Sequence, residues 1–310
     1  MTEAPPLVVL AGATATGKTE LAIRLAESLA ADGRPVAIIS ADSRQVFRGL
    51  DIGTAKASAA ERARVPHHGL DLVDPDEPFS VADFVTHATG VLTGLGRQDG
   101  VAILAGGTGL YLRAVARGLD TGALPSDEAV RARLEARLVS DGLAPMVERL
   151  TTMAPRLATT VDLRNPRRVV RALEIAELQG DAPRPPARGY GGPVAWVGLR
   201  VDPAEHRARI AARARAQFGA GLIEEARHLR ERFDPGLPAF SAIGYREAWA
   251  VLDGELTLDA AVELDAQRNA AFAKRQATWF RSEPDIVWLD ATAGISTAAA
   301  LDEIRLVIAG

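Results

Sequence analysis

A stretch of eight residues near the N-terminus has the composition of a phosphate-binding loop. Gly12-Ala13-Thr14-Ala15-Thr16-Gly17-Lys18-Thr19 fits the pattern GxxxxGK[ST], between an apolar run and a helical pattern. Its glycines let backbone N–H groups curl around a polyphosphate, while Lys18 adds a positive charge and the Thr19 hydroxyl is suited to ligate Mg²⁺. The motif therefore predicts phosphate binding, but it does not say which phosphate compound is bound.

A carboxylate follows the next apolar run. Val36-Ala37-Ile38-Ile39 ends in Ser40-Ala41-Asp42-Ser43. Asp42 is suited to accept a proton from an incoming nucleophile; the alternatives are that it caps a helix or holds Mg²⁺ through water. A third run, Val101-Ala102-Ile103-Leu104, ends in Gly-Gly-Thr without the acidic residue that NTP-hydrolysing motors and switches need. This combination favours group transfer from a phosphorylated donor.

The apolar runs that carry these residues predict a parallel sheet. Residues 7–10, 36–39 and 101–104 are apolar in nearly every position and are separated by helical segments, and residues 194–199 and 286–289 look like two further strands. Sites on such sheets lie beyond the carboxyl ends of the strands. We therefore expect the phosphate loop, Asp42 and the Gly-Gly-Thr segment to surround one crevice.

The middle of the chain predicts a helical insertion. Residues 125–179 are rich in Ala, Leu, Arg and Glu at helical spacing, and a Pro/Gly/Arg-rich connector follows. We expect an α/β fold: a P-loop parallel-sheet core in residues 1–120 and 191–310, with an inserted all-helical domain in residues 121–190. The net charge is −4, yet residues 131–215 hold 16 Lys+Arg against 9 Asp+Glu. This local excess favours an anionic partner for the middle of the chain.

Composition narrows the class further. The 310 residues include no cysteine, which excludes disulfides, thiolate metal sites and a cysteine nucleophile. The sequence shows neither a signal peptide nor an apolar stretch of membrane-spanning length. We expect a cytoplasmic monomer without membrane association, and a loop structured around Pro66 rather than a metal site at His67 and His68.

Across nearly its whole length the chain resembles the tRNA dimethylallyltransferase family, also called tRNA isopentenyltransferases. A P-loop alone is shared by many unrelated proteins, whereas the run from Asp42 to Lys56, followed in order by Gly-Gly-Thr and Lys-Arg-Gln, is highly specific. The matching stretches are Gly12–Thr19, Ile39–Lys56, Pro66–Asp71, Gly106–Tyr111, Asn165–Arg168, Arg171–Glu174, Ile243–Arg246, Ala273–Gln276 and Thr278–Phe280.

The resemblance implies transfer of a dimethylallyl group from dimethylallyl diphosphate to N6 of adenosine 37, in tRNAs reading codons that begin with U, with release of pyrophosphate. It implies that Asp42 receives the N6 proton, that the phosphate loop and Arg213 hold the diphosphate, and that Mg²⁺ lies at Thr19. The implied partners are this donor and the tRNA anticodon stem-loop, gripped by the helical insertion. The residues implied to contact tRNA are Asp42, Ser43, Arg44, Gln45, Thr108, Arg167, Arg168, Val169, Val170, Arg171, Ser241, Ala242, Ile243, Gly244, Tyr245, Arg246, Lys274 and Arg275.

Some residues depart from the family pattern. Ala13 replaces a common proline and Thr16 a common serine, changes that leave the backbone cradle intact, and Phe47 stands where tyrosine is usual. Ala270 stands where the family often has arginine, which removes one implied phosphate contact and predicts weaker tRNA binding with unchanged chemistry.

Three other functions are compatible with a phosphate loop. A P-loop small-molecule kinase would also place Asp42 beside the loop, but it has no need for a basic insertion. A prenyltransferase acting on free AMP would lack the stretches implied to contact tRNA. A non-catalytic RNA-binding protein or an ATP-driven switch is disfavoured by the complete diphosphate cradle and by the missing acidic strand end.

Overall fold

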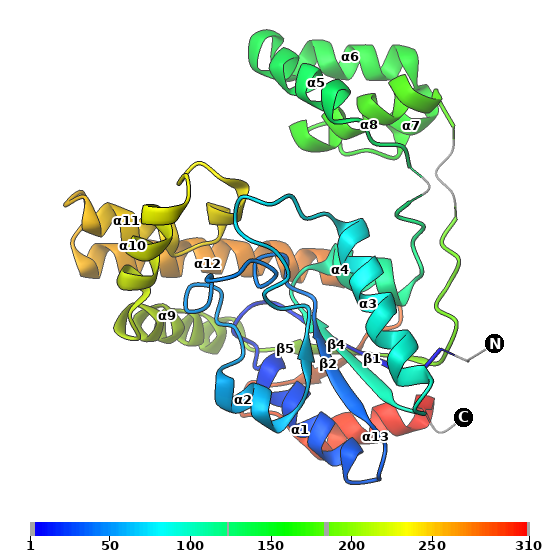
Figure 1. Ribbon diagram of the computed structural model, residues 1–310, viewed down its shortest axis with the longest axis vertical. Coiled ribbons are helices and arrows are strands. Elements are labelled where there is room, and N and C mark those ends of the chain that lie inside the picture. The colour runs from blue at the N-terminus through cyan, green and yellow to red at the C-terminus, as the bar shows by residue number, and fades with distance from the viewer. Residues whose placement is uncertain (1–3, 123, 183–185, 309–310) are drawn as a thin grey trace. The chain divides into compact units, whose positions relative to one another are not determined.

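The computed structural model describes residues 4–122, 124–182 and 186–308. The chain forms two compact units, unit 1 in residues 1–118 and 189–310 and unit 2 in residues 119–188 (Figure 1). Among the described residues, none of the helices combines the length and the apolar character that a membrane span requires.

Unit 1 is built on a parallel sheet, whose described strands run in the order β3-β2-β4-β1-β5-β6. The predicted α/β fold, a P-loop parallel-sheet core with a helical insertion, is confirmed. The two-residue strand β3 was not expected, since its residues are polar and it is defined by its pairing with β2. The strands are β1 (Leu7–Gly12), β2 (Val36–Ser40), β3 (His67–His68), β4 (Val101–Gly106), β5 (Val194–Arg200) and β6 (Val287–Asp290).

Helices cover both faces of the sheet, because alternate side chains of the buried strands point to opposite sides. One face packs against α1 and α13, and the other against α3, α4 and α12 (Figure 1). The helices of unit 1 are α1 (Lys18–Ala30), α2 (Ala59–Arg64), α3 (Val81–Gly96), α4 (Gly109–Ala116), α9 (Pro203–Gly219), α10 (Leu222–Arg232), α11 (Tyr245–Leu252), α12 (Leu258–Arg281) and α13 (Thr297–Ile308), with a 3₁₀ turn at Pro238–Ser241.

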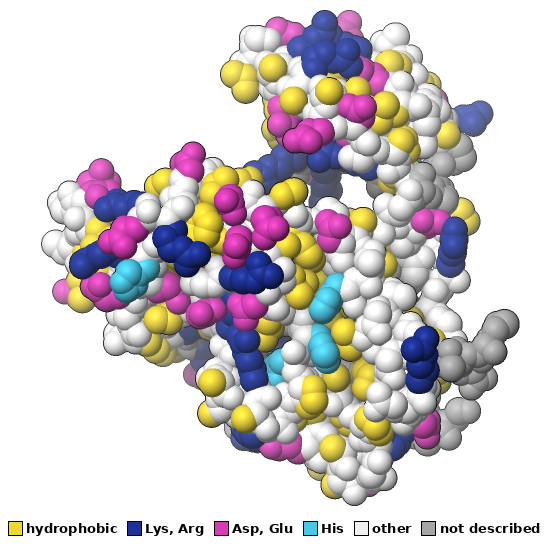
Figure 2. Space-filling view, in the orientation of Figure 1, with side chains coloured by type: hydrophobic (Ala, Val, Ile, Leu, Met, Phe, Trp, Pro, Cys, Tyr) yellow, Lys and Arg dark blue, Asp and Glu magenta, His cyan; other side chains and the backbone are white. Residues whose placement is uncertain are grey.

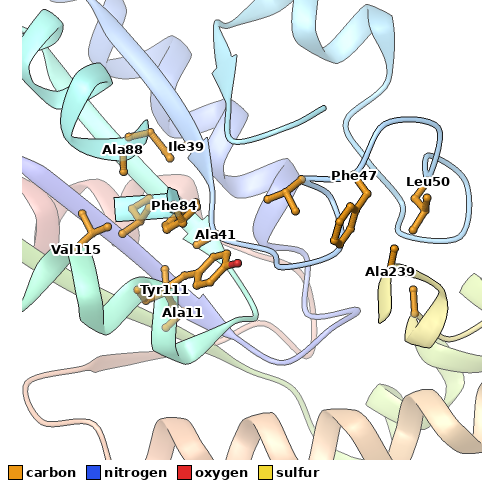
Figure 3. Packing of buried hydrophobic residues seen from close by; sticks show 14 of the residues in the cluster. Ala11, Ile39, Ala41, Phe47, Leu50, Phe84, Ala88, Tyr111, Val115 and Ala239 are labelled. Atoms are coloured by element: carbon orange, nitrogen blue, oxygen red, sulfur yellow. The ribbon is translucent and has the colours of Figure 1, made fainter. Parts of the chain in front are cut away.

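A buried aromatic pair supports the strand ends that carry polar residues. The rings of Phe84 on α3 and Tyr111 on α4 stack with centroids 4.1 Å apart. They share a core cluster with Ile39 and Ala41, at the end of β2 (Figure 3). Ala41 immediately precedes Asp42, so this packing fixes the point at which the loop after β2 leaves the sheet.

Unit 2 is helical throughout the residues that are assigned regular structure: α5 (Glu128–Asp141), α6 (Leu143–Met153), α7 (Pro155–Thr159) and α8 (Pro166–Gln179). Its apolar core surrounds a buried carboxylate, Glu174, which pairs with Arg131 at 3.0 Å and Arg171 at 2.8 Å. Burial by itself would raise the pKa of Glu174, but hydrogen bonds from the two arginines hold it below its usual value. Glu174 therefore ties α5 to α8.

Candidate active site

A cavity of about 480 Å³ opens at the carboxyl ends of the central strands of unit 1. The placement expected from the strand ends is found, because the phosphate loop, the loop after β2 and the loop after β4 all line it. Helices α9 and α12 and the turn near Ser241 complete the wall. The lining residues are Thr14, Lys18, Thr19, Ser40, Asp42, Ser43, Arg44, Gln45, Gly53, Thr54, Ala55, Ala105, Gly106, Gly107, Thr108, Arg213, Ser241, Ala242, Ile243, Arg268, Asn269, Ala271, Phe272, Arg275 and Gln276.

The phosphate loop has the backbone of an anion-binding nest. Ala15 and Gly17 adopt left-handed conformations, with φ of 59° and 92°. A Cβ at Gly17 would lie 2.7 Å from Ile295 Cδ1, so glycine is required there for space as well as for φ. In the part of the chain that the structure describes, the N–H groups of Ala15, Thr16 and Gly17 make no hydrogen bond. Unpaired backbone donors at the start of α1 are suited to bind phosphate oxygens.

Two cationic side chains converge on this loop. Lys18 Nζ donates to Ala13 O at 2.7 Å, and Arg213 Nη1 donates to Thr14 Oγ1 at 2.9 Å. Burial and, to a smaller extent, the Arg213 charge lower the pKa of Lys18 to about 7, although the Asp42 charge opposes both. Arg213 Nε is buried and has no partner among the described residues. An anion in the cavity would relieve the repulsion between the two cations.

Asp42 faces the same cavity from the loop after β2. Its Oδ1 accepts the backbone N–H of Arg44 at 2.8 Å, whereas Oδ2 makes no hydrogen bond to the described residues. The neighbouring Ser43 N–H donates to Thr108 Oγ1 at 3.0 Å, which joins the loops after β2 and β4. The carboxylate is thus oriented through one oxygen while the other is free to accept a proton.

Gln276 of α12 connects two of these loops. Its Oε1 accepts the N–H of Thr14 and its Nε2 donates to Gly107 O, both at 2.9 Å. A Cβ at Gly107 would lie 2.2 Å from that Nε2, so the bridge requires glycine at this position. Because both the oxygen and the nitrogen of the amide are hydrogen-bonded, its orientation is fixed. The bridge holds the loop of Thr14 and the loop of Gly107 together.

Comparison with known proteins identifies the family. Residues 45–283 match the family described as IPP transferase. A tRNA dimethylallyltransferase from Bordetella pertussis is 40% identical over 307 residues, covering 96% of each chain, and one from Anaeromyxobacter sp. is 44% identical over 288 residues, covering 91% of this chain and 92% of the relative. The chain belongs to the IPP transferase family. The crystal structure of a tRNA isopentenylpyrophosphate transferase from Bacillus halodurans agrees with a TM-score of 0.70 at 38% identity, covering 97% of this chain and 95% of that one.

The residues implied by resemblance to contact tRNA lie in several different places in this IPP transferase. Asp42 to Gln45, Thr108, Ser241 to Ile243 and Arg275 line the cavity, and Arg246 and Lys274 are exposed elsewhere on unit 1. Arg167 and Arg168 are exposed at the start of α8 in unit 2. The cavity also contains residues that the sequence analysis did not assign: Gly53, Thr54, Ala55, Arg268, Asn269, Phe272 and Gln276.

Some residues of the stretches implied to contact tRNA have buried or paired side chains. The side chains of Val169 and Val170 are buried in the core of unit 2, and Tyr245 is buried in the core of unit 1. Arg171 is held by Glu174 and by Pro125 O. Packing thus withdraws the side chains of the two valines and the tyrosine from the surface, and contact of their stretches with tRNA stays a prediction.

Tyr245 instead helps to hold the loop before Thr54 in place. Its hydroxyl donates to Glu225 Oε1 at 2.7 Å, and the same carboxylate accepts the N–H groups of Ile52 at 2.7 Å and Gly53 at 3.0 Å. A Cβ at Gly53 would lie 2.6 Å from the tyrosine ring. Tyr245 therefore supports the segment at Gly53 from behind and does not itself line the cavity.

The charged surface of this IPP transferase is uneven. On the face of unit 1 seen in Figure 2, acidic and basic side chains are interspersed over α10 and α11, so this area lacks a field of one sign. Among the described residues of unit 2, the exposed arginines that form no ion pair include Arg167 and Arg168, at the start of α8. Phosphate oxygens are favoured at such a helix end.

The cavity offers few ligands for a metal. Thr19 Oγ1 makes no hydrogen bond to the described residues, and the Asp42 carboxylate lines the same cavity. No group of three or more potential protein ligands occurs among the described residues. A Mg²⁺ ion typically takes one or two protein oxygens, with the remaining positions filled by phosphate and water, and the Thr19 hydroxyl fits that pattern.

Proposed function

We propose that this IPP transferase transfers a dimethylallyl group from dimethylallyl diphosphate to N6 of adenosine 37 in tRNA, releasing pyrophosphate. Family membership and the similarity to tRNA dimethylallyltransferases support this reaction. The structural observation that carries the proposal is that one cavity is lined by Thr14, Lys18 and Thr19 of the phosphate loop, by Arg213, and by Asp42, whose Oδ2 makes no hydrogen bond to the described residues. The phosphate loop and Arg213 are suited to bind a leaving group, and Asp42 is suited to remove a proton.

The reaction requires both the cationic phosphate loop and the Asp42 carboxylate. The lone pair of an exocyclic adenine amine is delocalised into the ring, so the amine is a poor nucleophile and the donor must be activated. As the N6–C1 bond forms and the C1–O bond breaks, the electron pair of the latter passes to the diphosphate oxygen. Backbone N–H groups of the phosphate loop, Lys18 and Arg213 stabilise that growing negative charge. Asp42 Oδ2 then takes the N6 proton, which prevents reversal.

Thr19 is the residue that we propose to hold Mg²⁺, through its hydroxyl. The ion would supply further charge neutralisation for the diphosphate. This assignment is supported by the unpaired hydroxyl and by the position of Thr19 in the cavity wall.

The acceptor base must leave its stack to reach the cavity, because a stacked base does not expose N6 to a carboxylate in a pocket. We propose that Ser43 to Gln45, Thr108 and Arg275 contact the extruded nucleotide and its neighbours. Arg167 and Arg168 of unit 2 are proposed to bind phosphates of the anticodon stem-loop, since they are exposed beside a helix N-terminus. Single-stranded loops are the usual targets of sequence-specific RNA recognition, and we propose that the substrates are tRNAs reading codons that begin with U.

We further propose a monomer acting in the cytoplasm. Sedimentation of the purified protein at micromolar concentration should give a single species of the mass of one chain.

Label transfer tests the function directly. The full chain is incubated with Mg²⁺, radiolabelled dimethylallyl diphosphate and an anticodon stem-loop carrying A36-A37-A38. Label should enter this RNA and should not enter a matched stem-loop with guanosine at position 37. Free AMP and γ-labelled ATP are offered in parallel. Label in AMP, or transfer of the γ-phosphate without prenylation of the RNA, would contradict the proposal.

A further inference from the structure

Thr14 is held by three side chains from distant parts of the chain. Gln276 binds its N–H and Arg213 its hydroxyl, and the third contact comes from His206 on α9, whose Nε2 lies 2.7 Å from Thr14 O. A carbonyl oxygen only accepts hydrogen bonds, so Nε2 carries the hydrogen and donates it. Of the three contacts, the imidazole is the one that touches the peptide unit between Thr14 and Ala15.

That peptide unit matters for anion binding. In a trans peptide, the carbonyl of one residue and the N–H of the next point in opposite directions. The bond from His206 draws the Thr14 carbonyl toward α9 and thereby aims the Ala15 N–H the other way. This N–H is one of the unpaired donors of the phosphate loop. His206 thus binds the carbonyl end of the same peptide group whose N–H end is presented to the diphosphate.

The same peptide is under conformational strain. Ala15 has φ of 59°, in the left-handed region that a residue with a Cβ disfavours. Rotation of the peptide by half a turn would bring this φ into the extended region, relieve the strain and turn the Ala15 N–H away. Neither Gln276 nor Arg213 opposes this rotation, because they contact the preceding N–H and the side chain.

We infer that His206 is a positioning residue for the diphosphate: its hydrogen bond to Thr14 O holds the peptide before Ala15 in the strained orientation that presents the Ala15 N–H to the donor. The inference rests on the proposed function and adds to it a residue that orients the phosphate loop without touching the diphosphate. His206 does not line the cavity, so it acts through Thr14 and not on the substrate.

The test is binding of inorganic pyrophosphate to the full-length protein in the presence of Mg²⁺, measured by calorimetry. His206→Ala should raise the Kd for pyrophosphate by about fivefold to tenfold, as expected when one hydrogen bond is removed. His206→Gln, which keeps an N–H donor, should stay within about twofold of the unmodified protein on the same scale. The matched control is His228→Ala, at an exposed histidine on α10, which should leave the Kd unchanged.

A second variant separates positioning from general destabilisation. Ala15→Gly removes the strain that favours peptide rotation, so His206→Ala should raise the Kd less in the Ala15→Gly background than in the unmodified protein. The Kd for the anticodon stem-loop should not change in His206→Ala. An unaltered pyrophosphate Kd in His206→Ala, an equal loss in both backgrounds, or a parallel loss of RNA binding would each overturn the inference.

The outcomes distinguish this inference from the proposed function. If the unmodified protein binds pyrophosphate but does not prenylate the stem-loop, the function fails and the His206 effect is still measurable. If it prenylates the stem-loop and His206→Ala binds pyrophosphate normally, the function stands and the inference is wrong.

Discussion

Arg213 Nη1 lies 2.9 Å from Thr14 Oγ1, although 199 residues separate the two in the chain. The bond attaches α9 to the third residue of the phosphate loop and leaves the Nε of the guanidinium buried without a partner among the described residues. Burial lowers the pKa of this guanidinium, and the charges of Asp42 and Asp265 oppose that effect. A polyanion in the cavity would stabilise the charged form further, so this pair links the structure of the loop to its chemistry.

Removing this guanidinium should slow transfer more than it weakens RNA binding. In Arg213→Ala, kcat for prenyl transfer is expected to fall about 10²- to 10³-fold, the usual loss for a donor that stabilises developing negative charge. Steady-state kinetics with saturating stem-loop would measure this. The control is Arg215→Ala, two residues along the same helix and exposed, which should retain normal kcat; equal effects in the two variants would contradict the role of Arg213.

Lys18 predicts a pH dependence. Its pKa in the free protein is lowered to about 7, first by burial and then by Arg213. The protonated amine binds the diphosphate, so kcat/KM for the donor should fall as pH rises through about 7, because the free protein loses this charge. The bound diphosphate favours the charged amine, so kcat should stay level to higher pH.

Calorimetry measures the protonation of Lys18 on ligand binding independently of the kinetics. Pyrophosphate binding at pH 8 should take up protons, seen as a binding enthalpy that varies with the ionisation enthalpy of the buffer. Lys18→Met should abolish the uptake along with most of the affinity. Proton release on binding, or a flat kcat/KM between pH 6 and 9, would show that Lys18 is already fully charged in the free protein.

The exposed arginines of unit 2 predict a salt-dependent RNA interaction. Arg167→Ala and Arg168→Ala should each weaken stem-loop binding and reduce the slope of log K against log[salt] by about 0.7 to 0.9 for each RNA phosphate that is no longer neutralised. The Kd for pyrophosphate should not change. Arg137→Ala, exposed on α5, is the control. If all three variants show the slope of the unmodified protein, the start of α8 does not touch RNA phosphates.

The elements with strong local patterns were predictable from the sequence. Apolar runs identified β1, β2, β4 and β5, because buried parallel strands are apolar on both faces, and a further apolar run identified the edge strand β6. The sequence Pro66-His67-His68 carries no such pattern, since β3 exists by pairing with β2. The phosphate motif and the strand-end rule likewise predicted which loops line the cavity.

The contacts that tie these loops together were not predictable. Gln276 and His206 reach Thr14 across 262 and 192 residues, and no local pattern records such a distance. Similarly, the resemblance marked Tyr245 as part of a tRNA-contact stretch, whereas packing places it inside unit 1, bound to Glu225. A motif shows that a residue matters; tertiary structure decides whether it faces the substrate or supports a residue that does.

The carboxylate of Asp42 is the group on which the proposed chemistry depends most. Asp42→Asn keeps an oxygen to accept the Arg44 N–H but cannot take a proton, so the geometry of the loop should survive. The decisive measurement is the single-turnover rate of prenyl transfer, with stem-loop and donor prebound to the protein. Asp42→Asn should lower this rate about 10²- to 10⁴-fold while the Kd values for pyrophosphate and stem-loop stay within error of the unmodified protein. A single-turnover rate equal to that of the unmodified protein would contradict Asp42 as the base.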